Sequence, residues 1–193
     1  MKEILQTVLF ALLSAGLVVA QASMPKHWEF FSSNASHFEA KPESEDAHQG
    51  RSAVQVVSRE ASESDHALIY QKISAKNYRG KKLEVSGFLK ASGVTGWAGL
   101  WVRVDDSEGR VLEFDNMMDR PVRGTLPWKS YEIKLDVPSQ AWEIHFGALL
   151  CGQGEILVDD FKVEAVGRLL PGRELKKRIR EIPEAPMNLG FEE

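Results

Sequence analysis

The most constraining feature of this sequence is a series of short segments in which apolar and polar residues alternate, from about Ser52 to Val166. Alternation with a period of two is typical of β-strands that bury one face. Turn-forming residues separate the segments, and no convincing helical period occurs between them. The segments are SAVQVVSR, HALIYQKI, KKLEVSGFLKA, WAGLWVRVDD, RVLEFDNM, KSYEIKLDV, AWEIHFGALL and GEILVDDFKVEAV. Two packed antiparallel sheets therefore fit better than a parallel α/β design, which needs crossover helices.

The alternation also predicts which side chains of the central strands are buried. In the segment from Gly99 to Asp105, one face carries only aliphatic residues, namely Leu100, Val102 and Val104. The opposite face carries Trp101, Arg103 and Asp105. The stretch from Asp105 to Gly109 predicts a hairpin connection, because Asp and Gly tolerate the positive φ angles that such turns need.

Composition narrows the classes of function. With 43% apolar residues the chain can bury a core of its own, and its net charge of -4 gives no reason to expect nucleic acid or an anionic membrane surface as a partner. Cys151 is the single cysteine, which excludes an intramolecular disulfide. We expect Cys151 to behave as a small buried hydrophobe rather than as a reactive thiol.

The first residues predict export. A lysine precedes an apolar run from Val8 to Ala20, and Ala20 and Ala22 form an A-x-A pattern. The run is shorter than the roughly 20 residues that a transmembrane helix needs, so we expect a signal peptide over residues 1–22, and a periplasmic or secreted bacterial protein with no membrane contact after cleavage. An uncleaved anchor is the alternative.

The organisation that we expect after the signal is one β-sandwich module over residues 24–166 and a tail over 167–193. In the tail, Leu175, Ile179 and Ile182 recur at spacings of four and three, which predicts a short basic helix from about Pro171. We expect this helix to dock by its one apolar stripe, with an acidic partner as the alternative.

Three stretches resemble carbohydrate-binding modules with the galactose-binding-like fold. His48–Ala53 resembles their H-x-G-x-x-S/A stretch, and Gly154–Phe161 resembles their closing strand, which usually ends in Asp-Asp followed by an apolar residue. Gly96–Arg103, continued by Phe114–Pro121, is similar to a bacterial branch of that fold found alone or fused to regulators, peptidases and esterases. The resemblance covers roughly residues 27–166 and implies an all-β, antiparallel jelly-roll sandwich.

One departure from the family pattern concerns its first strand. Such modules commonly begin with N-L-x-F-E, whereas here Asn188–Glu192 carries this pattern at the C-terminus. The resemblance therefore suggests that the tail returns to supply that strand, either to its own sandwich or to a neighbouring molecule. A disordered terminus is the competing interpretation.

The resemblance also bears on metal binding. In that family the Glu of N-L-x-F-E and an Asp of the closing pair often help to hold a structural Ca²⁺, and the matching residues here are Glu192 and Asp160. A hard cation needs six to eight oxygen ligands, so two carboxylates at distant positions do not establish a site. No other cofactor is expected.

The candidate ligand surface is the polar face of the central strands. Sugars present apolar C–H faces and hydroxyl edges, so a site needs an aromatic platform beside planar hydrogen-bonding groups. The residues of these types are Trp97, Trp101, Arg103, Asn116, Asp119 and Arg120. The alternative is that both tryptophans fill one sheet face beneath a loop, and that Arg103 forms a buried ion pair with Asp119 or Asp115.

Catalytic motifs are missing from the sequence. It contains no H-E-x-x-H, G-x-S-x-G or P-loop pattern, and its five histidines are scattered without ligand-like spacing. A glycosidase-like pair such as Asp115 and Asp119 is the remaining enzymatic option. We therefore expect an exported, non-catalytic module that binds a carbohydrate or a cell-envelope glycan. The alternative is a structural or protein-interaction sandwich, with the wet face or the C-terminal strand contacting a partner chain.

Overall fold

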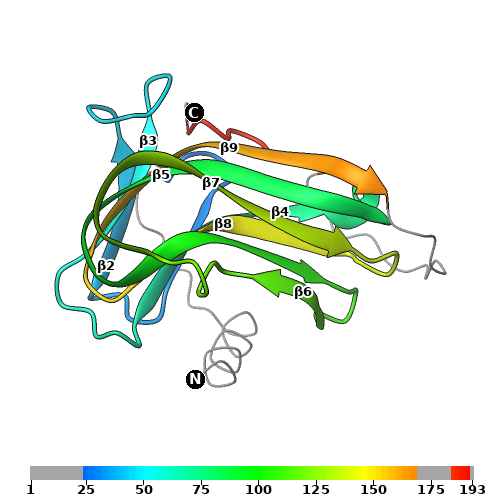
Figure 1. Ribbon diagram of the computed structural model, residues 1–193, viewed down its shortest axis with the longest axis horizontal. Coiled ribbons are helices and arrows are strands. Elements are labelled where there is room, and N and C mark those ends of the chain that lie inside the picture. The colour runs from blue at the N-terminus through cyan, green and yellow to red at the C-terminus, as the bar shows by residue number, and fades with distance from the viewer. Residues whose placement is uncertain (1–23, 169–183, 192–193) are drawn as a thin grey trace.

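A computed structural model describes residues 24–168 and 184–191 of the chain. This part of the chain folds into nine β-strands and one short 3₁₀ helix (Figure 1). The elements are β1 (Glu29–Ser32), β2 (Phe38–Glu43), β3 (Ala53–Ser58), β4 (His66–Ser74), η1 (Ala75–Asn77), β5 (Lys81–Asp105), β6 (Val111–Asp115), β7 (Val122–Val137), β8 (Glu143–Cys151) and β9 (Gly154–Arg168). The predicted antiparallel all-β fold is confirmed, and each of the predicted segments contains a strand. β1 and β2 were not predicted.

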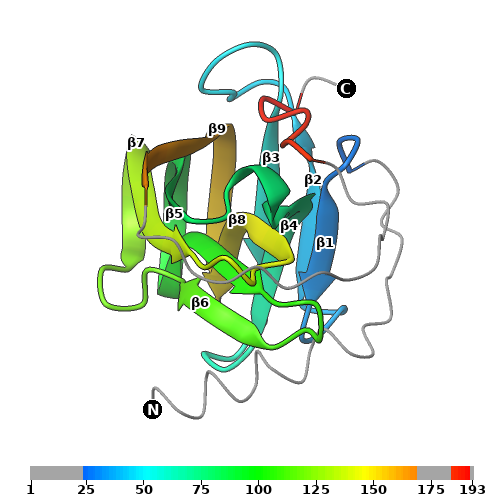
Figure 2. The ribbon, with the colours of Figure 1, turned by 90° about the vertical axis from the view of Figure 1, so that its right-hand side faces the viewer.

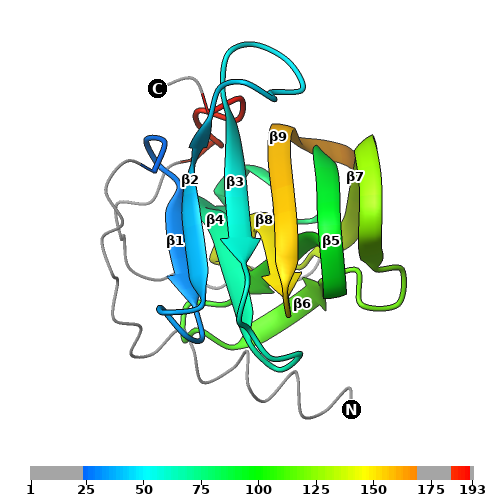
Figure 3. The same cartoon turned by 90° about the vertical axis from the view of Figure 1, so that its left-hand side faces the viewer.

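The long strand β5 joins the two layers of the sandwich. The strands follow the order β1-β4-β8-β5-β9-β3-β2, and β6 and β7 each pair with β5. The first half of β5 pairs with β9 and β7, whereas the half from Trp97 to Asp105 pairs with β8. Figure 3 shows β3, β9, β5 and β7 side by side, and Figure 2 shows the opposite side of the molecule, with β6 and β8 in front.

The predicted segments KKLEVSGFLKA and WAGLWVRVDD belong to one strand, because the turn-forming residues Ser92 and Gly93 between them do not end β5. Gly93 has a φ of 60°, and the pairing of β5 with β7 shifts register on either side of Val94. Glycine accepts this left-handed conformation without strain, so β5 bends from one layer into the other instead of stopping.

The hydrophobic core lies between the two layers and has the side chains that the alternation predicts. Leu100, Val102 and Val104 are fully buried in it. From the facing layer, Ile133 of β7 and Phe161 of β9 pack into the same core. Close packing of such aliphatic and aromatic groups is what stabilises a chain without a disulfide.

The C-terminal segment 184–191 returns to its own sandwich. The indole Nε1 of Trp28 donates to the carbonyl oxygen of Asn188 over 2.9 Å. The Gln71 side chain accepts from the backbone N of Met187 over 3.1 Å and donates to the carbonyl oxygen of the same residue. Phe191 is only 2% exposed and packs on Trp28, with ring centroids 4.7 Å apart. The predicted return of the tail is therefore found within one molecule.

The conformation of that segment differs from the prediction, because no strand occurs in residues 184–191. Turns occupy this stretch, with Asn188 and Phe191 at φ angles of 49° and 57°, and left-handed residues interrupt strand pairing. The predicted signal peptide and the predicted basic helix from Pro171 lie outside the described residues. Within the described residues, no helix is long and apolar enough to cross a membrane.

Candidate functional site

The outer side of the β1-β4-β8-β5-β6 layer carries a second hydrophobic cluster, separate from the core, which we call the aromatic face. Phe31, Phe114 and Met118 are half-buried and pack against it. Its members lie on β4, β8 and β5 and are Leu68, Tyr70, Trp97, Trp101, Leu149 and Cys151. These are the alternate residues of strands whose other side chains fill the core.

Two large rings meet at the centre of the aromatic face because a glycine lies between them. Gly147 is the register partner of both Tyr70 and Trp101 on the strands at either side. A Cβ at Gly147 would lie 1.9 Å from the carbonyl oxygen of Ile69, so the position requires glycine. The rings of Tyr70 and Trp101 contact edge to face, with centroids 6.1 Å apart.

One end of the aromatic face is polar and charged. The Nε of Arg103 donates to both carboxylate oxygens of Asp105, over 2.9 and 3.0 Å, and its second terminal nitrogen also contacts this carboxylate. His145 lies beside the pair, with its Nε2 3.0 Å from Glu143 Oε1 and 3.5 Å from Asp105 Oδ2. Arg103 is 5% exposed and Asp105 is fully buried, so this ion pair is shielded from solvent.

Three nitrogens of buried rings lack a hydrogen-bond partner in the described structure. They are Trp101 Nε1, His145 Nδ1 and His66 Nε2. The Nε2 of His145 faces carboxylate oxygens, which accept hydrogen bonds, so it carries a hydrogen. The Nδ1 atom is then an acceptor in the neutral ring and a donor in the imidazolium. By the same logic the proton of His66 lies on Nδ1, 3.5 Å from the Ser64 carbonyl oxygen, and its Nε2 is an acceptor.

His66 lies at the other end of the aromatic face from His145, as the register partner of Cys151. Burial lowers the pKa of the His66 imidazole and keeps the ring neutral. The face thus presents a buried donor on Trp101, a buried acceptor on His66 and the unpaired Nδ1 of His145. Unpaired buried polar atoms are uncommon in native proteins and point to a missing partner.

The predicted tryptophan platform is present, but it is not exposed. Trp97 and Trp101 are 9% and 1% exposed, respectively, and lie among the aliphatic side chains of the aromatic face. Arg103 is next to Trp101 in the same strand, and its partner is Asp105 rather than the Asp119 or Asp115 that the alternative named. Asp105 is two residues from Arg103 on the same strand face, which makes it the closer carboxylate.

The other three predicted ligand residues lie in the connection between β6 and β7. Arg120 forms ion pairs with Asp115, at 2.7 Å, and with Asp119, at 2.8 Å. The side chain of Asn116 accepts from the backbone N of Met118 over 3.2 Å and so fixes the turn. This connection therefore lies beside the aromatic face, with Met118 reaching onto it.

The position matched to a family calcium ligand does not fit a hard cation. Asp160 Oδ2 lies 2.7 Å from His48 Nδ1. Its neighbour Asp159 is buried and accepts from the backbone N of His48, Gln49 and Asp160. These oxygens face N–H groups, whereas Ca²⁺ needs six to eight oxygens directed at one point. Glu192, the second predicted ligand, lies outside the described residues.

Asp105, Glu143 and His145 form the one metal-compatible group found among the described residues, with one ligand atom of each within 4.8 Å of the others. Arg103 already neutralises Asp105 there. We therefore interpret the group as a charged hydrogen-bond network.

The described strands form an antiparallel jelly-roll sandwich, the fold that the sequence resemblance implied. No family model matches the chain. It is 37% identical over 169 residues to the uncharacterised HTH-type transcriptional regulator YbfP of Bacillus subtilis (strain 168). This match covers 87% of the chain and 57% of the regulator, so the chain spans little more than half of that relative.

Solved structures with low sequence identity share the fold. The enzymatically active domain of bacteriophage CBA120 tailspike protein 4 has a TM-score of 0.59 at 11% identity, covering 79% of this chain and 21% of that one. The tandem CBM22 domain of Paenibacillus barcinonensis Xyn10C has a TM-score of 0.54 at 17% identity, covering 84% and 47%. The CBM22-1–GH10 modules of Clostridium thermocellum Xyn10B have a TM-score of 0.52 at 19% identity, covering 77% and 28%.

Sequence reasoning missed three polar members of this region, namely His145, Glu143 and Tyr70. The signal was present in AWEIHFGALL, where Ile144, Phe146, Ala148 and Leu150 alternate with the residues of the opposite face. Spacing along the chain does not reveal His145, because His145 and Arg103 are partners across two paired strands.

Proposed function

We propose that this protein is a non-catalytic carbohydrate-binding module and that the aromatic face is its binding surface. The observation that carries the proposal is the pair of unsatisfied nitrogens on neighbouring rings, Trp101 Nε1 and His145 Nδ1. Trp101 Nε1 is a donor, and His145 Nδ1 is an acceptor in the neutral ring and a donor in the imidazolium. A hydroxyl group both accepts and donates a hydrogen bond, so one sugar hydroxyl is chemically suited to satisfy both.

The surroundings of this pair suit the rest of a sugar ring. Tyr70 and Trp101 offer aromatic surface for apolar C–H groups, and Leu68 and Leu149 extend it toward His66. The acceptor on His66 offers a further position for a hydroxyl group. An apolar strip with polar groups at both ends is the arrangement that small polar ligands require.

A sugar must reach rings that are buried in the described structure. Phe114 on β6 and Met118 in the following connection pack against the aromatic face. β6 has five residues and pairs with β5 alone, so it is held by few backbone hydrogen bonds. Met117 anchors the connection after β6 in the main core, so we infer that the side chains of Phe114 and Met118, rather than the backbone, move aside when a ligand binds.

Two observations support the absence of catalysis. The carboxylates near the aromatic face are occupied, with Asp105 paired to Arg103 and Asp115 paired to Arg120. A glycosidase needs one carboxylic acid and one carboxylate free to act on opposite sides of a bond. Several structures that share the fold are described as xylan-binding domains or carbohydrate-binding modules, which supports the same role.

The experiment that tests the proposal is a titration of intrinsic tryptophan fluorescence with a panel of soluble plant, bacterial and host glycans. We expect at least one glycan to change the emission of Trp101, because its indole would gain a hydrogen bond. Calorimetry then gives the affinity, and thin-layer chromatography of the same mixtures shows whether the glycan is cleaved. If no glycan of the panel changes the tryptophan fluorescence, glycan binding is contradicted. If a glycan is cleaved, the non-catalytic role is contradicted.

We also propose that the protein is exported. The support is the sequence pattern alone, in which a lysine, an apolar run and an A-x-A motif ending at Ala22 precede the sandwich. Mass spectrometry of the protein isolated from the producing cell tests this proposal. A chain that begins at Ser23 is expected, and a chain that retains residues 1–22 would contradict cleavage.

A further inference from the structure

A second candidate site lies on the other layer of the sandwich, at the end of the β2–β3 pair. A pocket of about 240 Å³ is lined by Ser36, His37 and Glu39 on one side and by Val57–Glu60 on the other. β2 and β3 pair with Glu39 opposite Val57, and they belong to the layer that does not carry the aromatic face. The pocket is therefore separate from the surface proposed to bind sugar.

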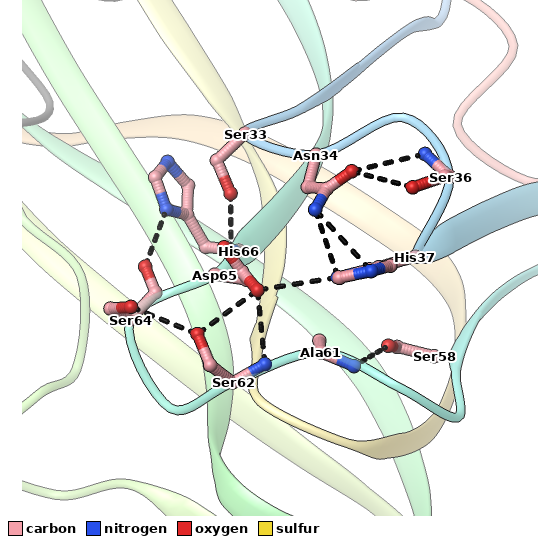
Figure 4. A network of polar contacts seen from close by, with 10 residues as sticks. All are labelled: Ser33, Asn34, Ser36, His37, Ser58, Ala61, Ser62, Ser64, Asp65 and His66. Atoms are coloured by element: carbon pink, nitrogen blue, oxygen red, sulfur yellow. Dashed lines mark hydrogen bonds and ion pairs between the residues drawn. The ribbon is translucent and has the colours of Figure 1, made fainter.

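One wall of this pocket is held in place by a polar network (Figure 4). His37 Nδ1 lies 3.4 Å from Asp65 Oδ2, and Asn34 Nδ2 lies 3.0 Å from the same ring nitrogen. The Asp65 carboxylate also accepts from the backbone N and the hydroxyl of Ser62, each over 3.0 Å. These hydrogen bonds, first of all that of the Ser62 backbone, lower the pKa of Asp65 and keep it ionised. Because one ring nitrogen cannot donate to Asp65 and accept from Asn34 at the same time, the tautomer of His37 decides which contact is a hydrogen bond, and either one restrains the ring.

The charged side chains of the pocket are not used within the described structure. Arg59, Glu39 and Glu60 line it and are exposed, and none of their side chains makes a hydrogen bond or ion pair with another described residue. Opposite charges that line one pocket without pairing leave both a cationic and an anionic group for a ligand. Guanidinium groups bind carboxylates through two parallel hydrogen bonds, and carboxylates bind ammonium groups.

The size of the pocket limits the ligand. Sites for drug-sized molecules enclose roughly 300–1,000 Å³, so a pocket of about 240 Å³ suits a smaller molecule. Val57 adds a small apolar contact, and the hydroxyl of Ser58, which accepts from the backbone N of Ala61, still has its hydrogen to donate.

We propose that this pocket binds a free amino acid, with the ligand carboxylate on Arg59 and the ligand ammonium between Glu39 and Glu60. The oriented His37 ring and the Ser58 hydroxyl supply the remaining polar contacts. This function is independent of sugar binding, because no residue of the aromatic face takes part in it.

The test is NMR titration of the full chain with the common amino acids, each up to 10 mM, monitoring the His37 ring resonances. We expect at least one amino acid to shift them. The N-acetylated and the amidated forms of that amino acid should each bind about tenfold more weakly or worse, because each loses one charge-assisted contact.

Substitutions with matched controls locate the site. Arg59→Gln and Glu60→Gln should each weaken binding at least tenfold. Arg123→Gln on β7 and Glu164→Gln on β9 change other exposed charges, outside the pocket, and should leave affinity unchanged. Circular dichroism checks that the four variants fold. Absence of any shift at His37, or equal binding by Arg59→Gln and the wild type, would overturn the proposal, and so would binding of a neutral sugar with no response to amino acids.

Discussion

Trp101 and His145 lie on the paired strands β5 and β8 with their ring centroids 6.4 Å apart, and each ring carries a buried nitrogen that has no partner in the described structure. A buried polar group without a partner costs about 1–3 kcal/mol. Two such groups lie side by side here, beside the fully paired Arg103–Asp105 bridge, and a water molecule or a ligand hydroxyl can complete them. We therefore take this pair of rings as the centre of the site.

The Arg103–Asp105 pair should be essential for stability. Asp105→Ala removes the carboxylate and leaves the Arg103 guanidinium buried without a counter-ion. We expect a loss of about 3–5 kcal/mol in the free energy of unfolding, measured by urea denaturation. Arg120→Gln breaks an exposed bridge to Asp115 and Asp119 and should cost less than about 1 kcal/mol. Equal effects of the two substitutions would contradict the assigned burial of Arg103.

The alternation of apolar and polar residues was sufficient to predict most strands. It placed Leu100, Val102 and Val104 in the core and Trp101, Arg103 and Asp105 on the other face, as the structure confirms. It failed for β1, whose four residues EFFS are all half-buried and show no alternation. It also divided β5 in two, because a glycine that permits a bend looks in sequence like a glycine that ends a strand.

The site was harder to predict because exposure depends on residues far away in the sequence. Because Trp101 alternates with core residues, the sequence predicts correctly that it lies on the face opposite the core. The residues that shield it from solvent, Phe114 of β6 and Met118, are not adjacent to it in sequence. Likewise, His145 meets Asp105 only through the pairing of β8 with β5, and strand pairing is not visible in one sequence. Residue types were therefore easier to predict than their partners.

His66 should make stability depend on pH. Burial lowers the pKa of His66 below its usual value of about 6.5, so protonation costs more in the folded than in the unfolded state. Above about pH 6.5 the ring is neutral in both states and the folded protein is most stable. The free energy of unfolding then falls as the pH decreases below about 6.5. His66→Gln should remove this part of the pH dependence of the free energy of unfolding, measured by urea denaturation between pH 7.5 and 5.

A second buried group, Asp159, titrates in the same pH range, and its effect on the pH dependence of stability is opposite to that of His66. Burial raises the pKa of Asp159 to about 6, so its contribution to stability decreases as pH rises from about 4 to 6. We therefore compare, at each pH, the free energies of unfolding of wild type and His66→Gln. The contribution of Asp159 is the same in both proteins and cancels in the difference. A difference that stays constant with pH would contradict the buried, neutral state of His66.

Cys151 should be inert while the protein is folded. Burial raises the pKa of its thiol to about 12, so the thiol stays protonated at pH 8. We expect no reaction with iodoacetamide in native buffer and complete reaction in 6 M guanidinium, followed by mass spectrometry. Stoichiometric labelling of the native protein within minutes would show that Cys151 is accessible.

The C-terminal segment should stabilise the sandwich from within the same molecule. Phe191→Ala removes a ring that packs between Trp28 and Phe161, and we expect a cost of about 3 kcal/mol or somewhat less, because the segment lies near a chain end. Leu126→Ala, at an exposed position on β7, is the control. Truncation after Pro183 should lower the melting temperature and leave the molecular mass by light scattering monomeric. An unchanged melting temperature would contradict the docking of residues 184–191.

The central claim is that the buried nitrogen of Trp101 binds a sugar hydroxyl, and calorimetry on Trp101→Phe tests it most directly. This substitution keeps an aromatic ring and removes Nε1. With the glycan selected from the panel, we expect affinity to fall by up to about tenfold, the worth of one neutral hydrogen bond. Trp128→Phe, which removes an Nε1 bonded to Asp46 away from the face, should bind like the wild type. Equal affinity of Trp101→Phe and wild type would contradict the account.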